Sequence, residues 1–597
     1  MSKTTSRTSH RSSQYDVAIV GGGVSGIYSG WRLATAKPGE SERLHSWTRR
    51  TDKLKVAVFE GSDRIGGRLL SARPPGFSDT TTCEIGGMRY VSAQTLVRSL
   101  VENELNLRTY PQVVDQSSNM VFLRGKHLRF SQTSDPAALP YDLDWAEEQY
   151  IVKNDPSSLM IWAIAKLLPG VLQFTGKALH KYLQTAEVKG TPLYQHGFWN
   201  LVARGLSPGA YALARSMVGY DVLGSNANAV DLIAEYMDFA PDAKFSNFSH
   251  GYETVPWTLQ KRFEDAGGEI VHGAWLAGFE QTTLDDRSLG VELHFTDNRA
   301  PVKARAIILA MPRRSLELLR REGPLFDGPK TPHVQHLLNS VRPFPLFKLF
   351  LAYKYPWWNA VGVSKGRSIA DTPLRQLYYW PVDPAAATPS ASGDALLMAY
   401  NDATSVDFWD GLSGANSKMH SPEALKHLRR VAPPGMRMFE AQQQPGAGAS
   451  AADEFGKRLL KNWADHQAPH EMVKEMHRQI MQMHDIQFAP EPYDAAYMDW
   501  SEDPYGGGSH LWNHGYKSWE ILHQMTQPVE DFPCYVCGEA YSTNQTWVEG
   551  ALQTAEIVLQ KHLGLAKPSW ITPNPEPVTK NGKAQHAAPA KSKVASR

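Results

Sequence analysis

One candidate catalytic residue of this chain is a lysine inside an apolar run. Lys348 is the one charged residue in PLFKLFLAY, residues 345–353. Burying an ammonium group is costly unless the group is paired or neutralised, and the pKa of a buried lysine shifts readily. The run therefore indicates either a buried functional lysine or an edge-strand lysine whose head group reaches solvent.

A glycine-rich turn near the N-terminus has the pattern of a dinucleotide site. Residues 16–20 predict a buried parallel strand, and Gly21-x-Gly23-x-x-Gly26 follows at once. The glycines permit a tight turn, close approach of backbone N–H groups to a pyrophosphate, and packing of a helix whose N-terminus favours phosphate. Residues 55–59 predict a second strand that ends at Glu60, whose carboxylate can accept hydrogen bonds from a ribose. Strand, glycines, helix, strand and acid occur in order, although Glu60 lies beyond the usual spacing of ~20 residues.

Two more pairs of glycines follow this unit. Gly66-Gly67 precedes Arg68, and Gly86-Gly87 precedes Met88-Arg89. Paired glycines bring backbone N–H groups close to a planar or anionic ligand without obstruction by side chains. Two such pairs after one strand-helix-strand unit favour a ligand over simple turns.

This arrangement resembles the flavin-dependent amine oxidase superfamily, and most of all its L-amino-acid oxidases. The resemblance implies non-covalent FAD, with the first glycine pair along the pyrophosphate and the second beside the isoalloxazine. Residues 535–556 are similar to the closing FAD motif of the family, in which a helix N-terminus stabilises negative charge on the reduced ring. The residues that the resemblance assigns to FAD are Gly21, Gly23, Val24, Ser25, Gly26, Glu60, Gly61, Gly67, Arg68, Gly86, Gly87, Met88, Arg89, Leu276, Gly538, Glu539, Trp547 and Val548.

The resemblance also implies roles in catalysis and substrate binding. A lysine at the motif of Lys348 holds a water at flavin N5 in the family. Arg89 is placed to bind a substrate carboxylate with two parallel hydrogen bonds, and Tyr400 matches a tyrosine that helps to bind it. Trp547, preceded by Thr546, matches a residue near the α-amino group. Arg89 could instead pair with Glu84 or with an FAD phosphate.

Two residues depart from the family pattern. Thr546 replaces a glycine that usually precedes the tryptophan, which bears on the α-amino contact. Phe344 stands where secreted relatives carry an arginine, which indicates a different entrance or side-chain pocket.

The function implied is oxidative deamination of L-amino acids. Hydride leaves Cα–H, the imino acid hydrolyses to a 2-oxo acid and ammonia, and O2 yields H2O2. The substrate must first lose its ammonium proton, so the rate should rise with pH, although no residue stands out as a general base. The alternatives are an L-amino-acid 2-monooxygenase, a polyamine or monoamine oxidase, and a flavin-bearing sensor without turnover.

The resemblance implies a discontinuous α/β fold with three domains. A Rossmann-type (GR2-like) FAD-binding domain is expected over residues 15–92, 246–325 and 500–565, and a mixed-sheet substrate domain over residues 93–135 and 326–499. Residues 136–245 predict a helical domain. The further predicted strands are 269–272, 291–296, 304–310 and 396–400, and the remaining segments are a loop at 37–52, a mobile insertion at 432–453, and disordered tails at 1–14 and 566–597.

The charge balance of the chain indicates which classes of partner it binds. Lysine plus arginine (62) nearly balances aspartate plus glutamate (61), so we expect small molecules, an L-amino acid and O2, and neither nucleic acid nor membrane. The chain shows no secretory signal and no apolar run of the ~20 residues that a membrane-spanning helix needs, so a cytoplasmic protein is expected, as a homodimer.

Three cysteines cannot form a disulfide framework, and Cys534-x-x-Cys537 is either a redox pair or two buried residues. No metal site is expected.

Overall fold

The computed structural model describes residues 14–572 except 38, 49–52, 223, 239–243, 298, 328–330, 384–392 and 415–450. The chain divides into two compact units of discontinuous segments. Unit 1 comprises residues 1–68, 253–341 and 518–570, and unit 2 comprises residues 69–252, 342–517 and 571–597. Both units combine helices with mixed sheets, which confirms the α/β fold class.

Unit 1 is built on a seven-stranded sheet of order β12-β2-β1-β15-β14-β13, in which β23 also pairs with β15. Parallel pairing joins β12, β2, β1, β15 and β23, and antiparallel pairing joins β15, β14 and β13. The strands are β1 (Gln14–Val20), β2 (Val56–Phe59), β12 (Glu269–Val271), β13 (Leu276–Thr283), β14 (Leu289–Phe295), β15 (Val302–Leu309) and β23 (Cys534–Val536). The predicted strands of this unit are present. The apolar side chains of β1, β2 and β15 are almost completely buried, as expected for parallel strands covered on both faces.

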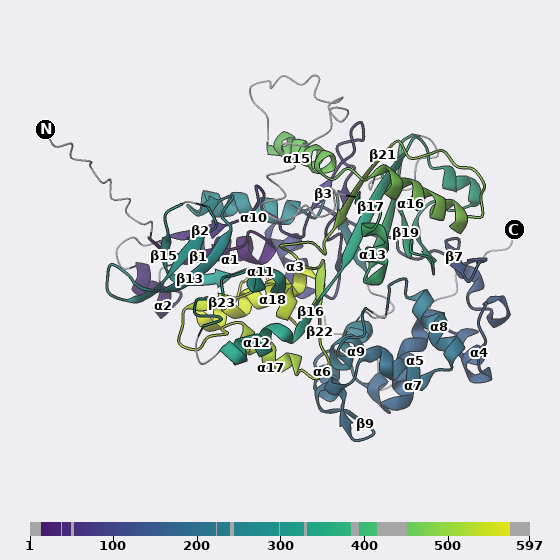
Figure 1. Cartoon of the computed structure of the whole chain (residues 1–597), viewed down its shortest axis with the longest axis horizontal. Coiled ribbons are helices and arrows are strands. Elements are labelled where there is room, and N and C mark those ends of the chain that lie inside the picture. Colours follow the sequence, from purple (N-terminus) through teal and green to yellow (C-terminus); the bar gives the residue numbers. More distant parts are fainter. Residues whose placement is uncertain are drawn as a thin grey trace. The chain divides into compact units, whose positions relative to one another are not determined.

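Helices surround the sheet of unit 1 (Figure 1). They are α1 (Val24–Ala34), α2 (Glu42–Thr48), α10 (Thr254–Asp265), α11 (Arg313–Glu317), α12 (Thr331–Asn339), α17 (Ser518–Met525) and α18 (Val548–Ile557). A buried ion pair between Arg32 and Glu556 ties α1 to α18, and the Tyr28 hydroxyl donates to the same carboxylate at 2.5 Å. The predicted loop at residues 37–52 contains α2. The polar composition of this segment does not predict α2, a short helix that buries Leu44 and Thr48, four residues apart, on one side.

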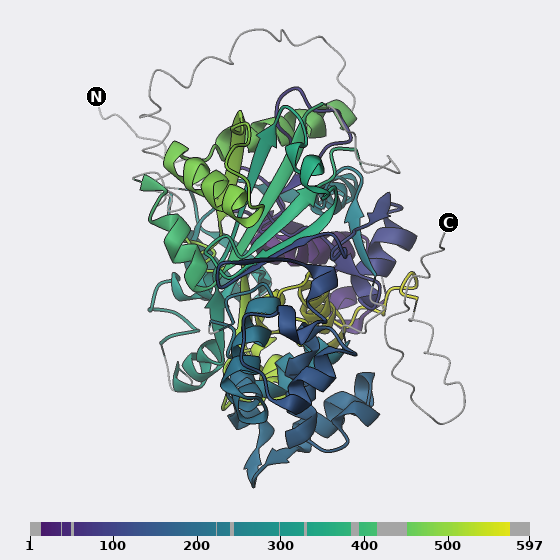
Figure 2. The ribbon, with the colours of Figure 1, turned by 90° about the vertical axis from the view of Figure 1, so that its right-hand side faces the viewer.

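Unit 2 contains a second seven-stranded sheet, of order β21-β17-β20-β19-β18-β7-β8 (Figure 2). All its pairs are antiparallel except β18 with β7. The strands are β7 (Met120–Leu123), β8 (Lys126–Arg129), β17 (Leu346–Tyr353), β18 (Gly366–Ala370), β19 (Gln376–Trp380), β20 (Ala395–Asp402) and β21 (Asp494–Asp499).

Short strands complete unit 2. The smaller sheets pair β3 (Ser71–Ala72) with β4 (Cys83–Glu84), β9 (Glu187–Val188) with β10 (Thr191–Pro192), and β11 (Phe245–Phe248) with both β5 (Tyr90–Val91) and β6 (Thr109–Pro111). In a further small sheet, β16 (Val341–Phe344), of which all but the first residue belongs to unit 2, pairs with β22 (Ser509–Trp512).

The two faces of β17 belong to two different cores. Its odd-numbered residues, Phe347 to Tyr353, pack with methionines of α16 (His470–Met483), which Figure 1 shows beside β17 and β19. Phe350 and Ala352 pack on the other face with Trp463 of α15 (Ala451–Asp465). Because side chains alternate along a strand, Lys348 shares the face of Phe350 and Ala352.

The remaining helices of unit 2 include a helical region that Figure 1 shows in blue. They are α3 (Thr95–Ser99), α4 (Trp145–Ile151), α5 (Leu159–Leu167), α6 (Gly176–Thr185), α7 (Phe198–Gly205), α8 (Pro208–Met217), α9 (Ala229–Asp238) and α13 (Thr404–Asp410). The mainly helical character expected for residues 136–245 is confirmed. The structure groups this region in one compact unit with the second sheet, so a separate helical domain stays a prediction.

Some predictions fall at the edges of the described chain. Residues 1–13, 432–450 and 573–597 lie outside the described residues, while 451–453 begin α15. The predicted tail from residue 566 begins too early, because Trp570 packs edge-on against Tyr28 with ring centroids 6.4 Å apart.

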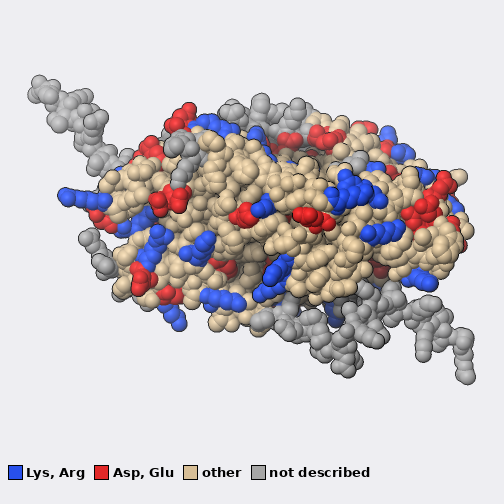
Figure 3. Space-filling model, turned by 90° about the horizontal axis from the view of Figure 1, so that it is seen from below, with Lys and Arg blue, Asp and Glu red and all other residues tan. Residues whose placement is uncertain are grey.

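Among the described residues, no helix is both long and apolar enough to cross a membrane. The face in Figure 3 carries interspersed acidic and basic side chains, as a net charge of +1 leads one to expect.

All three cysteines are free and buried. Cys534 lies on β23 and Cys537 just after it in unit 1, whereas Cys83 lies on β4 in unit 2. Burial raises the pKa of Cys83 and Cys534, and raises the pKa of Cys537 to about 12. A redox pair needs an accessible thiolate, so the structure favours two buried residues at Cys534-x-x-Cys537.

Candidate functional site

The glycine turn of unit 1 lies at the carboxyl end of β1. Gly21 has a φ of +103°, and a Cβ there would lie 2.4 Å from the carbonyl oxygen of Ala310. A Cβ at Gly26 would lie 1.9 Å from the carbonyl oxygen of Gly21. Packing of the chain therefore requires glycine at both positions, the first for the turn and the second for the helix.

Gly23 differs from its two neighbours in the motif. The nearest atom to a Cβ there would be Cα of Gly67 at 3.9 Å, so the chain leaves room for a side chain. Gly23 and Gly66 form an isolated parallel bridge, which places the two glycine segments side by side. The space over Gly23 fits the approach of a pyrophosphate to the backbone, as FAD would require.

Helix α1 begins immediately after Gly23. Its N-terminus has no capping side chain and no acidic residue in the first turn. Val24 and Ser25, both predicted to bind the cofactor, are its first two residues. The first N–H groups of a helix have no partners within it and carry partial positive charge, so they fit a phosphate.

Glu60 stabilises the loop after β2 by hydrogen bonds. Its carboxylate accepts hydrogen bonds from Gly22 N at 2.6 Å and from Ser62 N and Oγ at 2.8 Å. A carboxylate has about four acceptor positions, so the one that remains can receive a ribose hydroxyl. The ring of Trp275 covers Gly61, where a Cβ would approach it to 2.6 Å, and predicted Leu276 begins β13 next to this tryptophan.

Glu539 joins two segments predicted to hold FAD. Its Oε1 lies 2.6 Å from Nη1 of Arg68, and its Oε2 accepts a hydrogen bond from Thr546 N at 3.3 Å. Gly538, just before it, has a φ of +139°. The structure thus brings Arg68, which follows Gly67, to the segment that leads into α18.

Thr546 stands where the family motif has a glycine, and its own backbone is left-handed. Its φ is +73°, in the left-handed region, which costs a residue with a side chain about 1–2 kcal/mol. Trp547 follows as the half-buried N-cap residue of α18, and Val548 is the first residue of the helix. A threonine therefore occupies a backbone conformation that glycine adopts without strain.

In unit 2, Lys348 is buried, with 5% of its surface exposed. Its Nζ donates hydrogen bonds to the carbonyl oxygens of Glu84, at 3.1 Å, and of Gly86. Burial lowers the pKa of Lys348 to about 7; Glu84 opposes this shift and Arg89 adds to it. The alternative of a lysine that reaches solvent is contradicted.

Arg89 is a half-buried cation that has neutral and aromatic neighbours. Its Nη1 donates to Oε1 of Gln112 at 3.0 Å, and its Cζ lies 4.1 Å from the centre of the Phe245 ring. No carboxylate of the described chain lies within ion-pair distance of this guanidinium. Glu84 instead accepts hydrogen bonds from Ser71 Oγ and Tyr252 N, so the pairing of Arg89 with Glu84 is not observed.

Tyr400 lies directly opposite Lys348 in the register of β20 and β17. The Lys348 Nζ is 5.1 Å from the centre of its ring, and the Tyr220 ring packs edge-on against it at 5.8 Å. Burial is the main cause that raises the pKa of Tyr400, so the phenol stays protonated. No residue in the described part of the chain hydrogen-bonds to its hydroxyl, which leaves the hydroxyl available as a donor.

Unit 2 therefore brings together four predicted positions: Gly86, Arg89, Lys348 and Tyr400. Gly87 is exposed, Met88 is buried among the residues around Trp463, and Phe344 is buried at the end of β16. Sequence reasoning missed Gln112, Phe245, Tyr220 and Trp275. Phe245 reaches Arg89 because β11 pairs with β5, a long-range pairing that no local pattern reveals.

Comparison with known proteins identifies relatives of this chain. Residues 25–451 match the family described as flavin containing amine oxidoreductase. Aplysianin-A of Aplysia kurodai is 25% identical over 578 residues, covering 92% of this chain and 90% of that protein. L-amino acid oxidase Bs29 of Bothriechis schlegelii is 24% identical over 415 residues, covering 69% of this chain and 72% of that protein.

A solved structure shares the fold. Wild-type putrescine oxidase bound to putrescine aligns with a TM-score of 0.58 and 16% identity, over 92% of this chain and 99% of that chain. At this identity the likeness concerns the fold alone. The glycine turn, the open space over Gly23 and the uncapped helix fit a flavin dinucleotide, and the family match spans more than half of the sequence. The chain belongs to the flavin-containing amine oxidoreductase family.

Proposed function

We propose that this protein oxidises L-amino acids to 2-oxo acids, with release of ammonia and H2O2. Arg89 carries the proposal, because it is a half-buried guanidinium without a carboxylate partner among the described residues. An amine without a carboxylate gives such a group nothing to bind. Relatives named as L-amino-acid oxidases support the substrate class, although they are only 22–24% identical.

FAD is the cofactor that this function requires. The residues that would hold it are those around Gly23, the N-terminus of α1, Glu60, and the Arg68–Glu539 pair. When bound, FAD accepts the hydride of the substrate and passes the electrons to O2. No covalent attachment is proposed.

Arg89 binds and orients the substrate. The face of its guanidinium lies on Phe245 and one N–H bonds Gln112, so other N–H groups remain for two parallel hydrogen bonds to a carboxylate. Tyr400 donates a further hydrogen bond from its protonated hydroxyl. Holding the carboxylate in this way fixes the direction of the Cα–H bond, which is how binding energy lowers the barrier.

Lys348 holds or accepts a proton. With its pKa lowered to about 7, part of the population is neutral near neutral pH. A neutral amine that donates two hydrogens to the carbonyls of Glu84 and Gly86 keeps its lone pair. That lone pair can hold a water or receive the proton that the substrate ammonium must lose before oxidation.

Anaerobic reduction of the flavin tests this function. The FAD-loaded protein is mixed with each of the twenty L-amino acids, with D-amino acids, and with monoamines and polyamines, while flavin absorbance is recorded. We expect loss of the oxidised spectrum with one or more L-amino acids only. Reduction by amines alone, or by none of these compounds, contradicts the proposal. Products formed in air then separate an oxidase, which gives ammonia, from a monooxygenase, which gives CO2 and an amide.

A further inference from the structure

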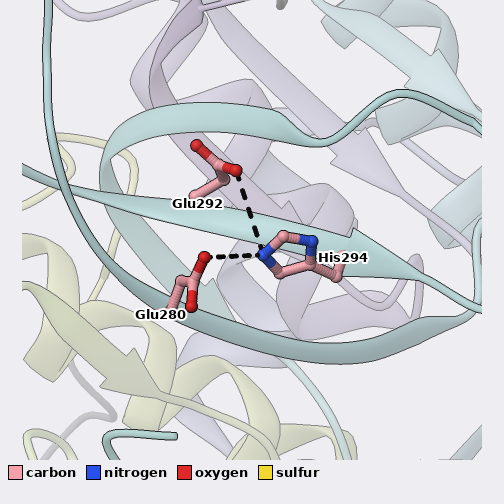
Figure 4. Close-up of side chains that lie close together, drawn as sticks. All are labelled: Glu280, Glu292 and His294. Atoms are coloured by element: carbon pink, nitrogen blue, oxygen red, sulfur yellow. Dashed lines mark hydrogen bonds and ion pairs between the residues drawn. The ribbon is translucent and has the colours of Figure 1, made fainter.

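The outer strands of the unit 1 sheet carry three possible metal ligands on one face. Glu280 of β13 lies directly opposite Glu292 of β14, and His294 follows Glu292 by two residues. Directly opposed residues share a face of a sheet, and so do residues two apart on one strand. Figure 4 shows both carboxylates directed toward the imidazole of His294.

The distances suit a single ion. His294 Nε2 lies 3.2 Å from Glu280 Oε1 and 4.0 Å from Glu292 Oε1. One ligand atom from each residue lies within 4.8 Å of the others. Three atoms this close need only small rotations of the side chains to reach the bond lengths of about 2.0–2.2 Å that zinc makes to nitrogen and oxygen.

The charges around the cluster also favour a cation. Two carboxylates directly opposite each other across a strand pair repel, and this destabilises the pair. Lys303 offsets part of that repulsion, since its Nζ lies 3.5 Å from Glu292 Oε2. It approaches the other oxygen of that carboxylate, so Oε1 still faces His294.

A hollow of about 930 Å³ adjoins the cluster, and Glu280 and His294 form part of its wall. Its other charged residues are Arg320, Glu322, Asp327, Glu530 and Asp531. With Glu280, five acids therefore face one arginine. The hollow keeps the ligand atoms accessible from outside and leaves room for water in the remaining coordination positions.

We propose that Glu280, Glu292 and His294 bind one divalent transition-metal ion, for which Zn²⁺ is the best fit. An imidazole ligand favours zinc over Ca²⁺ and Mg²⁺, and three protein ligands with a water complete a tetrahedral zinc site. The bound ion joins β13 to β14 and neutralises their opposed carboxylates. This site is independent of the oxidation proposed above. No spacing pattern in the sequence predicts this site, because its ligands come from two strands.

Zinc titration of the FAD-loaded, chelator-treated full chain tests the site. Isothermal titration calorimetry with Zn²⁺ measures the number of ions bound, and thermal unfolding with and without Zn²⁺ measures stabilisation. We expect wild type to bind one more ion than Glu292→Gln or His294→Gln, or to bind it at least about tenfold more tightly, with a Tm increase that the variants lack. Ca²⁺ and Mg²⁺ should give no such difference.

Two controls keep the test decisive. His45→Gln removes an exposed histidine of α2 in the same unit and should bind zinc as wild type does. Glu280→Gln removes one of two repelling charges, so its Tm without metal should not fall while its zinc response disappears. Zinc binding and Tm increases that are equal in wild type, Glu280→Gln, Glu292→Gln and His294→Gln would overturn the proposal.

Discussion

The two units position their predicted functional groups in different ways. Unit 1 does so with the main chain: a turn at Gly21, an open approach at Gly23, and the uncapped N-terminus of α1. Unit 2 does so with charged side chains, above all the buried Lys348 and the half-buried Arg89. Fixed backbone dipoles can hold a cofactor that stays bound. A charged substrate that binds and dissociates in each turnover is better held by side chains of opposite charge.

The cations of the two units also differ in their partners. Arg68 of unit 1 forms an ion pair with Glu539. Arg89 of unit 2 has an amide and an aromatic ring instead. Arg68 therefore joins two protein segments that are predicted to hold FAD, whereas Arg89 has no carboxylate partner among the described residues.

Removal of the Arg89 guanidinium should have the largest effect. Arg89→Met should lower kcat/KM for L-amino acids by about 10²–10⁴-fold, since it removes charge-assisted hydrogen bonds to the carboxylate. FAD content and Tm should stay near wild type. Steady-state oxygen consumption and the flavin spectrum measure these quantities. The matched variant Arg89→Lys keeps the charge and loses the parallel hydrogen bonds, so it should recover only part of the loss. A wild-type kcat/KM in Arg89→Met would show that Arg89 does not bind the substrate carboxylate.

Two alanine substitutions should separate packing from cofactor binding within one motif. Gly26→Ala should destabilise unit 1 by about 1–3 kcal/mol or more, because its Cβ meets the Gly21 carbonyl oxygen. Gly23→Ala should leave the Tm of the apoprotein unchanged and weaken FAD binding at least about tenfold, because its Cβ occupies the approach to the backbone. Thermal unfolding and flavin fluorescence titration measure the two effects. Equal loss of Tm in both variants would contradict the assignment of the open space to FAD.

Gly23 and Gly26 also show which structural features can be predicted from the sequence. Glycine spacing encodes a local backbone geometry, and an apolar run encodes local burial, so the turn and buried Lys348 were predictable. The partners of Arg89 were not, because Gln112 follows β6 and Phe245 begins β11, far apart in the chain. Helix α2 was missed since only Leu44 and Thr48 in it are buried.

The titration of Lys348 should be visible in both rate and stability. Its pKa falls to about 7 in the folded chain from the ordinary lysine value of 10.5, so the folded state binds fewer protons than the unfolded state between these values. Stability contributed by this group therefore rises with pH from about 7 to 10. The free energy of unfolding of wild type should increase over this range relative to Lys348→Met, as denaturant melts at several pH values would measure.

The rate should follow the same group. In wild type, kcat/KM should rise through about pH 7, and this step should be absent in Lys348→Met. A conservative Lys348→Arg variant stays charged over this range and should also lack the step. Identical pH profiles in all three proteins would show that Lys348 acts only structurally.

The smallest expected effect concerns Thr546. Thr546→Gly should raise the free energy of unfolding by no more than about 1 kcal/mol, since relief of the left-handed backbone is offset by the greater freedom of glycine when unfolded. Thr546→Val keeps the strained backbone and should give no gain. Chemical denaturation measures the difference. A large loss of stability in Thr546→Gly would mean that the threonine side chain makes a contribution of its own.

The buried cysteines offer a way to watch the two units separately. Cys83 belongs to unit 2, and Cys534 and Cys537 belong to unit 1. Because none is accessible in the folded chain, a thiol reagent can react only after local or global opening. Mass spectrometry of labelled peptides would therefore report an opening rate for each unit from one unmodified protein, with no probe added to either.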